Sequence, residues 1–351
     1  MARWLVTGGA GFCGRAIVAR LQQRGEIVRV LDTLPVTTPA VESFVGDVCD
    51  TVAVRRAMHD CQFVIHAAAA VPLARNRALF ARVNVAGTAT VLAIAREAGV
   101  TKTVVVSSSA VYGAPSQLPV TALTPMAPLE PYGQSKRDAD LLALAQAAQG
   151  QAVAVVRPRT VLGPGRSGLF ALLFEWVHRG HPIPLLGDGR AIYQFVHADD
   201  LADACIAAAQ APGPGPWLVG SAQPLPLGEL LARFCVQAGT GSRVIALPAS
   251  PVRPLLHLAA ALPGGAIAPY HAQLYGKPLW FDIATTCQGL GWQPQFDDVT
   301  ALTQSYQWYV SHRDDVAAGS AHSRPMAAGW LRWANRALRA AVRKCPCLLD
   351  K

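Results

Sequence analysis

A tyrosine and a lysine stand four residues apart in the stretch PYGQSK, at Tyr132 and Lys136. Pro131 precedes them and suits the first turn of a helix, where its missing N–H removes no helical hydrogen bond. Residues i and i+4 share one helix face, so the phenol and the ammonium would point the same way. A nearby cation favours the phenolate, which can accept a proton from an alcohol. The spacing suggests a proton-transfer pair, although a solvated helix face would show the same pattern.

Three glycines indicate a phosphate-binding turn. Gly8, Gly11 and Gly14 lie between an apolar stretch, residues 3–7, and a helical stretch that runs to about Gln23. Glycines there allow a tight turn and let backbone N–H groups approach a pyrophosphate at the helix N-terminus. A glycine-rich turn on its own is weak evidence, but the strand before it and the helix after it favour a dinucleotide site.

The acid at the end of the second apolar stretch distinguishes between two dinucleotides. Residues 26–32 end at Asp32, whose carboxylate can accept hydrogen bonds from ribose hydroxyls and would repel a 2′-phosphate. Lysine and arginine are absent from residues 33–54. We therefore predict NAD rather than NADP as the cofactor.

The stretches around these residues predict an α/β fold. Runs rich in Val, Ile and Leu alternate with helical segments, which favours a Rossmann-type doubly wound parallel sheet. The expected strands are residues 3–7, 26–32, 43–48, 62–70, 101–113 and 152–158, and two long helices are expected at 76–98 and 131–149. We assign residues 1–160 to an NAD-binding domain, to which residues 193–209 return. Residues 161–310 are expected to form a smaller α/β substrate-binding lobe.

The C-terminal part has a different composition. Residues 311–325 read as a polar linker, and residues 326–351 as a basic helical tail. Its arginines share one face, opposite Trp and Leu, at positions Arg332, Arg336, Arg339 and Arg343. Such an amphipathic helix could lie on an anionic membrane surface, or dock on the protein itself or a partner. Most of the net charge of +9 falls in this tail, so the body of the chain does not indicate nucleic-acid binding.

Composition and cysteine spacing indicate in which cellular compartment the protein is expected. Hydrophobic residues make up 52% of the 351 residues and charged residues 15%, which indicates a large folded interior. No signal peptide is visible, and no apolar run reaches the roughly 18–20 residues of a membrane span. The eight cysteines lack zinc-like spacing, so we expect reduced thiols and no metal site. The expected location is the cytoplasm, with the tail as a peripheral contact to the inner membrane face.

An ordered series of motifs resembles the extended short-chain dehydrogenase/reductase family. The motifs are TGGAGFCG (7–14), Asp32, GDV (46–48), HAAA (66–69), NVAGT (84–88), SSSAVYG (107–113), YGQSK (132–136), RPRTVLGPG (157–165), FVHADDLADA (195–204) and LGWQP (290–294). The resemblance covers residues 1 to about 310. It implies a Rossmann fold, NAD, and Tyr132 and Lys136 as the catalytic pair.

The resemblance also implies the other site residues. The third catalytic partner is the serine four residues before the tyrosine of VYG, which is Ser108, with Ser107 and Ser109 as rivals in the triplet. The implied cofactor-binding residues are Thr7, Gly8, Gly11, Phe12, Cys13, Gly14, Asp32, Asp47, Val48, Ala67, Ala68, Ala69, Asn84, Ser107, Tyr132, Lys136 and Pro158.

Two departures from family patterns bear on the reaction. Sugar dehydratases of this family carry an Asp-Glu pair after the serine position, where this chain has Ser109 and Ala110, so dehydration is not expected. Sugar-nucleotide enzymes usually carry an arginine just before the FVxVxD segment, where this chain has Tyr193 and Gln194. Other arginines, Arg166 and Arg190, could take that role.

The second lobe favours an apolar substrate. Residues 251–282 resemble the 3β-hydroxysteroid and sterol-4-carboxylate dehydrogenase branch, although ordinary core helices would share this composition. We predict an NAD-dependent oxidoreductase that interconverts a secondary alcohol and a ketone on a sterol- or isoprenoid-like substrate. The alternatives are a nucleotide-sugar 4-epimerase and a non-catalytic NAD-binding regulator. The family also implies a homodimer through the helices at 76–98 and 131–149.

Overall fold

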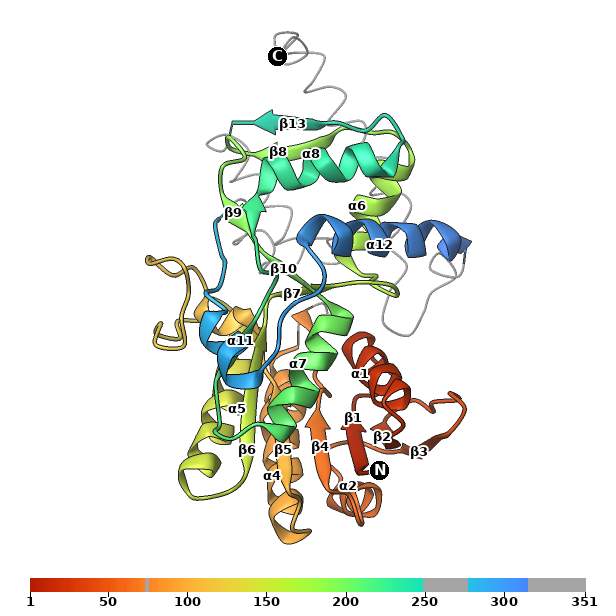
Figure 1. Ribbon diagram of the computed structural model, residues 1–351, viewed down its shortest axis with the longest axis vertical. Coiled ribbons are helices and arrows are strands. Elements are labelled where there is room, and N and C mark those ends of the chain that lie inside the picture. The colour runs from red at the N-terminus through yellow and green to blue at the C-terminus, as the bar shows by residue number, and fades with distance from the viewer. Residues whose placement is uncertain (73–75, 249–276, 315–351) are drawn as a thin grey trace. The chain divides into compact units, whose positions relative to one another are not determined.

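The computed structural model of the chain describes residues 1–72, 76–248 and 277–314, which divide into two compact units (Figure 1). Unit 1 contains Met1–Gly163, Ala191–Pro226 and Lys277–Leu302, and unit 2 contains Pro164–Arg190, Leu227–Gly276 and Thr303–Lys351. The predicted tail, most of the linker and most of the apolar segment 251–282 lie outside the described residues.

Unit 1 is built on a seven-stranded parallel sheet. Its strands in spatial order are β11 (Trp217–Val219), β6 (Val153–Pro158), β5 (Lys102–Val106), β4 (Phe63–His66), β1 (Arg3–Thr7), β2 (Ile27–Asp32) and β3 (Val41–Val45). The chain extends the sheet from β1 in one direction and then from β4 in the other. A ligand of such a sheet binds at the carboxyl ends of the strands where the direction changes. The predicted Rossmann-type doubly wound sheet is therefore confirmed.

Helices cover both faces of this sheet. One face packs against α1 (Phe12–Gln23) and α7 (Ala198–Gln210), and the other against α2 (Thr51–Met58), α4 (Gly87–Glu97) and α5 (Pro131–Ala148). The strands alternate between the two cores because successive side chains point to opposite faces. Trp4 and Val6 of β1 pack with residues of α1 and α7, whereas Leu5 packs with residues of α2 and α4.

Three predicted strands are shorter in the structure than expected. Residues 101–113 were expected as one strand, but β5 ends at Val106 and a 3₁₀ turn, η3, follows at Ser109–Tyr112. The Ser108 hydroxyl accepts the backbone N–H of Ala110 at 3.1 Å, which favours a turn over a strand. The expected strands at 43–48 and 62–70 are also shorter, ending at Val45 and His66.

The helix expected at 76–98 consists of three parts. They are α3 (Arg77–Phe80), a π-helical segment η2 (Ala81–Ala86) and α4. By length and composition alone Arg77–Glu97 could cross a membrane, but close to half of its apolar window is buried inside the protein. We interpret it as a core helix of unit 1.

The remaining elements complete the two units. Unit 1 adds the pairs β7 (Thr160–Leu162) with β10 (Phe195–His197) and β9 (Ile192–Tyr193) with β12 (Leu225–Pro226), and α11 (Ala284–Leu290). Unit 2 has α6 (Leu169–His178), α8 (Leu227–Ala238) and the parallel pair β8 (Ile183–Leu186) with β13 (Val244–Leu247). The boundary between the units falls within α12 (Asp298–Ser311).

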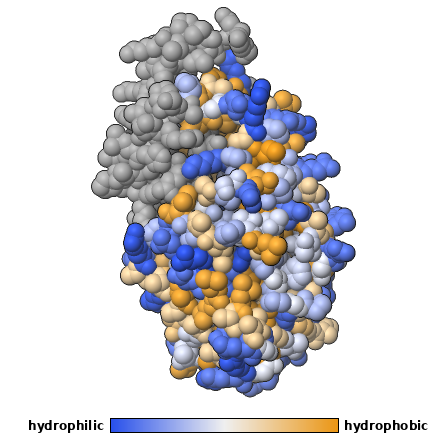
Figure 2. All heavy atoms as spheres, turned by 90° about the vertical axis from the view of Figure 1, so that its left-hand side faces the viewer, coloured by the Kyte–Doolittle hydropathy of each residue, from blue (hydrophilic) through white to orange (hydrophobic). Residues whose placement is uncertain are grey.

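One helix of unit 1 presents small and apolar residues to solvent. On α5, Leu141 is 48% exposed, and Ala145 and Ala148 are exposed on the same side. Figure 2 views the side on which α5 lies and shows hydrophobic residues gathered in its lower half. A contiguous apolar surface of this kind suits contact with another protein surface.

Candidate NAD and catalytic site

The glycine loop between β1 and α1 has room only for glycine at two positions. Gly8 has φ +75°, and a Cβ there would lie 2.6 Å from the backbone of Ala68. A Cβ on Gly14 would lie 2.0 Å from the carbonyl oxygen of Gly8. Gly11 precedes α1 without a side-chain cap, and the first turn of α1 has no acidic residue. The loop therefore presents backbone N–H groups and a helix N-terminus, which fit a pyrophosphate.

Asp32 lies at the carboxyl end of β2, beside this loop. One of its carboxylate oxygens accepts the N–H of Ala10 at 3.0 Å and the other accepts the N–H of Leu34 at 3.1 Å. These bonds fix the carboxylate at the end of the sheet where the loop begins. The position fits recognition of a ribose, as the sequence predicts.

Asp47 and Val48, two of the predicted cofactor-binding residues, have protein partners of their own. Asp47 accepts the N–H of Cys49 at 2.9 Å and a guanidinium hydrogen of Arg82 at 2.6 Å. Burial on its own would raise the pKa of Asp47, but these hydrogen bonds hold it below the ordinary value. Val48 is buried against Gly87, where a Cβ would lie 2.7 Å from the valine side chain.

Asn84 ties the alanine loop after β4 to α5. Its amide oxygen accepts the N–H of Ala70 at 2.7 Å, and its amide nitrogen donates to Ala70 O at 3.1 Å and to Ser135 Oγ at 2.9 Å. Asn84 is buried within the π-helical segment η2. Ala67 and Ala68 also line the close approach to Gly8. The small residues predicted at 67–69 are thus held against the glycine loop.

The start of α5 places Tyr132 beside the serine turn. Glu130 caps the helix, and its carboxylate accepts the N–H groups of Tyr132 at 2.8 Å and Gly133 at 2.6 Å. A Cβ on Gly133 would lie 2.7 Å from the carbonyl oxygen of Ala110, so the helix lies directly against η3. Tyr132 is half-buried, with its ring edge-on to Phe80 at 5.9 Å between centroids.

Lys136 joins the same helix to the end of β5. Its ammonium donates to the carbonyl oxygen of Val106 at 2.6 Å. Burial lowers the pKa of Lys136 to about 8, while the charge of Asp140 acts in the opposite direction. Val106 directly precedes the serine triplet, so this hydrogen bond places Lys136 beside the serine turn.

The three serines have different environments. The buried Ser107 hydroxyl has no partner among the described residues. The Ser108 side chain is half-buried and caps η3, and the buried Ser109 hydroxyl accepts a hydrogen bond from Arg159 at 2.9 Å. Of the triplet, Ser108 is the one with partial access to solvent. Pro158 ends β6 and is buried.

Sequence analysis missed a buried ion pair that anchors α5. Arg157 of β6 donates through Nε and Nη2 to the two carboxylate oxygens of Asp140, both at 2.8 Å, and through Nη1 to the Tyr112 hydroxyl at 2.6 Å. The sequence contains a signal for this pair, because Asp140 follows Lys136 by four residues on the helix and Arg157 lies at the end of the strand predicted at 152–158. Bidentate pairing of this kind fixes the rotation of α5 about its axis.

The histidine of the HAAA motif, His66, is buried and has no predicted role. His66, at the end of β4, lies between Thr7 Oγ1 at 2.7 Å and Thr88 Oγ1 at 3.0 Å. Burial, and then the charge of Lys136, lower its pKa to about 3. His66 is therefore neutral at physiological pH, which avoids a second cation beside Lys136.

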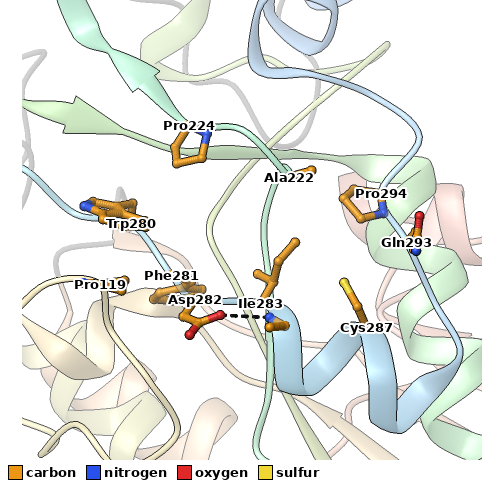
Figure 3. A pocket seen from close by; sticks show the side chains of 11 residues that line it. Pro119, Ala222, Pro224, Trp280, Phe281, Asp282, Ile283, Cys287, Gln293 and Pro294 are labelled. Carbon is orange, nitrogen blue, oxygen red and sulfur yellow. Dashed lines mark hydrogen bonds between the residues drawn. The ribbon is translucent and has the colours of Figure 1, made fainter.

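A hollow of about 540 Å³ opens elsewhere in unit 1 (Figure 3). It is lined by Pro119, Ala222, Pro224, Trp280, Phe281, Asp282, Ile283, Ala284, Cys287, Gln293 and Pro294. The lining is mostly apolar and includes none of the predicted catalytic residues. Asp282, just before α11, lines the hollow, but its carboxylate already accepts a hydrogen bond from the N–H of Ala284 at 2.9 Å.

Known proteins resemble the chain over most of its length. An uncharacterised protein of Sinorhizobium fredii is 40% identical over 327 residues, covering 92% of this chain and 83% of its own. A 3 beta-hydroxysteroid dehydrogenase/Delta 5→4-isomerase of Mycobacterium tuberculosis is 29% identical and covers 89% of this chain and 91% of its own. A UDP-glucose 4-epimerase from Thermotoga maritima, solved with UDP-glucose, shares the fold with a TM-score of 0.73 at 22% identity, over 89% of this chain and 99% of its own.

The sequence profile of one family matches residues 4–220, which include the glycine loop, Asp32, the serine turn and the Tyr132 helix. The resemblance to extended short-chain dehydrogenases is thereby confirmed, and with it the choice of NAD as cofactor. The chain belongs to the NAD dependent epimerase/dehydratase family.

Proposed function

We propose that this enzyme is an NAD-dependent dehydrogenase that interconverts a secondary alcohol and a ketone on a hydrophobic substrate. Support comes from the gathering of the serine turn, Tyr132 and Lys136 at the carboxyl end of β5. The Mycobacterium relative, whose name states a hydroxysteroid dehydrogenase, matches nearly the whole chain. We extend this substrate class, a sterol-like alcohol, to the present protein.

The proposed residue roles follow from acid–base chemistry. In oxidation, Tyr132 as a phenolate takes the hydroxyl proton of the alcohol, and in reduction it returns a proton to the carbonyl oxygen. Lys136 favours the phenolate because its charge lies nearby, and Ser108 hydrogen-bonds the reacting oxygen. The glycine loop and Asp32 would hold NAD, which would supply the hydride acceptor for the alcohol carbon.

One observation separates this proposal from the nucleotide-sugar alternative. Gln194 occupies the place where the sugar-nucleotide enzymes usually have a diphosphate-binding arginine. It is fully buried, donates to Ser221 O at 2.8 Å and accepts the N–H of Phe281 at 2.8 Å. The preceding residue, Tyr193, lies over the guanidinium of Arg159. Neither side chain carries a charge, so these two positions lack the cation with which sugar-nucleotide enzymes usually hold the diphosphate.

The first experiment is mass spectrometry of what the purified protein releases on denaturation. An epimerase recycles its nicotinamide in place, so near-stoichiometric retained NAD together with a nucleotide sugar would overturn the proposal. We expect partial or reversible occupancy by NAD, and NADH formation at 340 nm with dehydroepiandrosterone as the probe alcohol. Epimerisation of UDP-glucose, measured in parallel, should be absent.

A tyrosine variant tests the proton-transfer role. Tyr132→Phe should lower NADH formation by about 10²- to 10⁴-fold, because the ring remains and the proton acceptor is lost. NAD affinity should stay within a few fold. Tyr306→Phe makes the same chemical change in α12 and should leave turnover unchanged. Retained turnover in Tyr132→Phe would remove this residue from the mechanism.

We further propose that two copies of the chain associate through α4 and α5. The exposed apolar side of α5 supports this arrangement.

A further inference from the structure

Arg159 follows β6 in unit 1 and is 2% exposed. Its guanidinium lies between two rings, with Cζ at 5.2 Å from the centroid of Tyr193 and 5.6 Å from that of Phe281. Nη1 donates to the Ser109 hydroxyl at 2.9 Å. Nε and Nη2 are buried and have no hydrogen-bond partner in the described part of the chain. A buried guanidinium with two unpaired donors is unfavourable unless something binds them.

A neighbouring arginine shows what the Nε–Nη2 edge of a buried guanidinium can bind. Arg157 precedes Arg159 by two residues, and its Nη1 also donates to a hydroxyl, that of Tyr112. Its Nε and Nη2 each donate to one carboxylate oxygen of Asp140 at 2.8 Å. These two nitrogens form the planar fork that matches a carboxylate. Arg159 presents the same fork without a carboxylate from the described residues.

Asp298 does not fill this role. The charge of Arg159 lowers the pKa of Asp298, but the two side chains form no hydrogen bond. One oxygen of Asp298 accepts the N–H of Phe195 at 2.8 Å, and the Ser221 hydroxyl also acts on this carboxyl group, lowering its pKa. Burial outweighs these effects and raises the pKa of Asp298 to about 7, so near neutrality it compensates only part of the arginine charge.

We propose that the Nε–Nη2 edge of Arg159 binds a carboxylate group of the substrate. The inference rests on the proposed function, because Ser109, which orients the guanidinium, adjoins Ser108 of the proposed catalytic set. It narrows the substrate to a hydrophobic alcohol or ketone that carries a carboxylate. Both nitrogens are buried, so neighbouring side chains must move for the carboxylate to enter, and Tyr193, which is half-buried beside the guanidinium, is the candidate for this movement.

The test compares two probes of the same shape, 4-bromobenzoate and the neutral 4-bromobenzamide, on the NAD-loaded protein. Isothermal titration should show the benzoate binding at least tenfold more tightly than the amide. Arg159→Met should remove this difference, and Arg159→Lys should restore only part of it, because an ammonium lacks the fork. Arg233→Met, which removes an exposed arginine of α8, should leave the difference intact.

Crystals of the unaltered protein with NAD and 4-bromobenzoate keep the proposal testable if the Arg159 variants fail to fold. The anomalous signal of bromine should place the carboxylate on Nε and Nη2 of Arg159. Water molecules on these two atoms, a bromine position elsewhere, or equal affinity for both probes would overturn the inference. Neither readout needs turnover, so a protein that binds the benzoate but oxidises no alcohol would overturn the proposed function alone.

Discussion

At the scale of single residues, we predict that Asp32 decides which dinucleotide binds. Its carboxylate is fixed by the N–H groups of Ala10 and Leu34, at the end of β2. A fixed negative charge there accepts hydrogen bonds from ribose hydroxyls and repels a 2′-phosphate. Residues 33–54, which follow Asp32, contain no lysine or arginine that would favour a 2′-phosphate.

The double variant Asp32→Ala/Thr33→Arg should therefore change cofactor preference. We expect the ratio of the NADH and NADPH dissociation constants, measured by nucleotide fluorescence, to shift at least about 100-fold towards NADPH, which is about 2.7 kcal/mol. The single variant Thr33→Arg is the control and should shift the ratio less, since the aspartate remains. An unchanged ratio in the double variant would show that Asp32 does not face the ribose.

The residue scale also shows the limit of reasoning from sequence. The glycine loop, Asp32 and the Tyr-Lys spacing are local patterns, and each lies where its pattern predicts. The partners of Ser109 and Asp140 are Arg159, which follows β6, and Arg157 of β6, 50 and 17 residues away, and no local pattern specifies such pairings. The 3₁₀ turn after Val106 was missed because the serine triplet continues a run of valines, and only the Ser108 cap distinguishes turn from strand.

At the scale of elements, the two sides of α5 differ. Its inner side carries Tyr132, Lys136 and Asp140 toward the sheet, and its outer side exposes Leu141 and small residues. A dimer contact through this side would stiffen the helix that carries the proposed catalytic pair. The same helix would then link association to the geometry of the site.

Leu141→Glu should convert the proposed dimer into a monomer. Burying a carboxylate in an apolar contact costs several kcal/mol, which exceeds what a small interface can offset. Light scattering coupled to gel filtration would measure the mass. Val236→Glu places the same charge on α8, at a valine that is 81% exposed, and should not change the mass. Two outcomes would contradict the proposal: a monomeric parent protein, or a dimeric Leu141→Glu variant.

At the scale of the whole molecule, buried carboxyl groups set the pH dependence of stability. Burial raises the pKa of Asp298 to about 7 and that of Asp200 to about 6, despite the hydrogen bonds that both accept. The folded protein therefore holds these protons to a higher pH than the unfolded chain does. Their contribution to stability is complete below the unfolded pKa, near 4, and is lost as the pH rises to about 7.

Asp298→Asn should raise the thermal midpoint at pH 8 and change it little at pH 4. The amide keeps an oxygen for the N–H of Phe195 and removes the ionisation, so the expected gain at pH 8 is on the order of 1–3 kcal/mol. Asp297→Asn alters the adjacent exposed aspartate, which caps α12 through Thr300, and serves as the control. Equal shifts at both pH values would assign the effect to packing rather than to proton binding.

The π-helical segment that carries Asn84 has a consequence for how the protein can change over time. A π turn contains one more residue than the α-helical turn it replaces. Substitutions alter side chains but leave the residue count unchanged. Losing the segment would require a deletion, which would rotate the preceding residues of α3 by about 100° and move Asn84 away from Ala70 and Ser135. The hydrogen bonds between Asn84 and the alanine loop should therefore tolerate substitutions elsewhere in the helix. A deletion or insertion in the helix should break them.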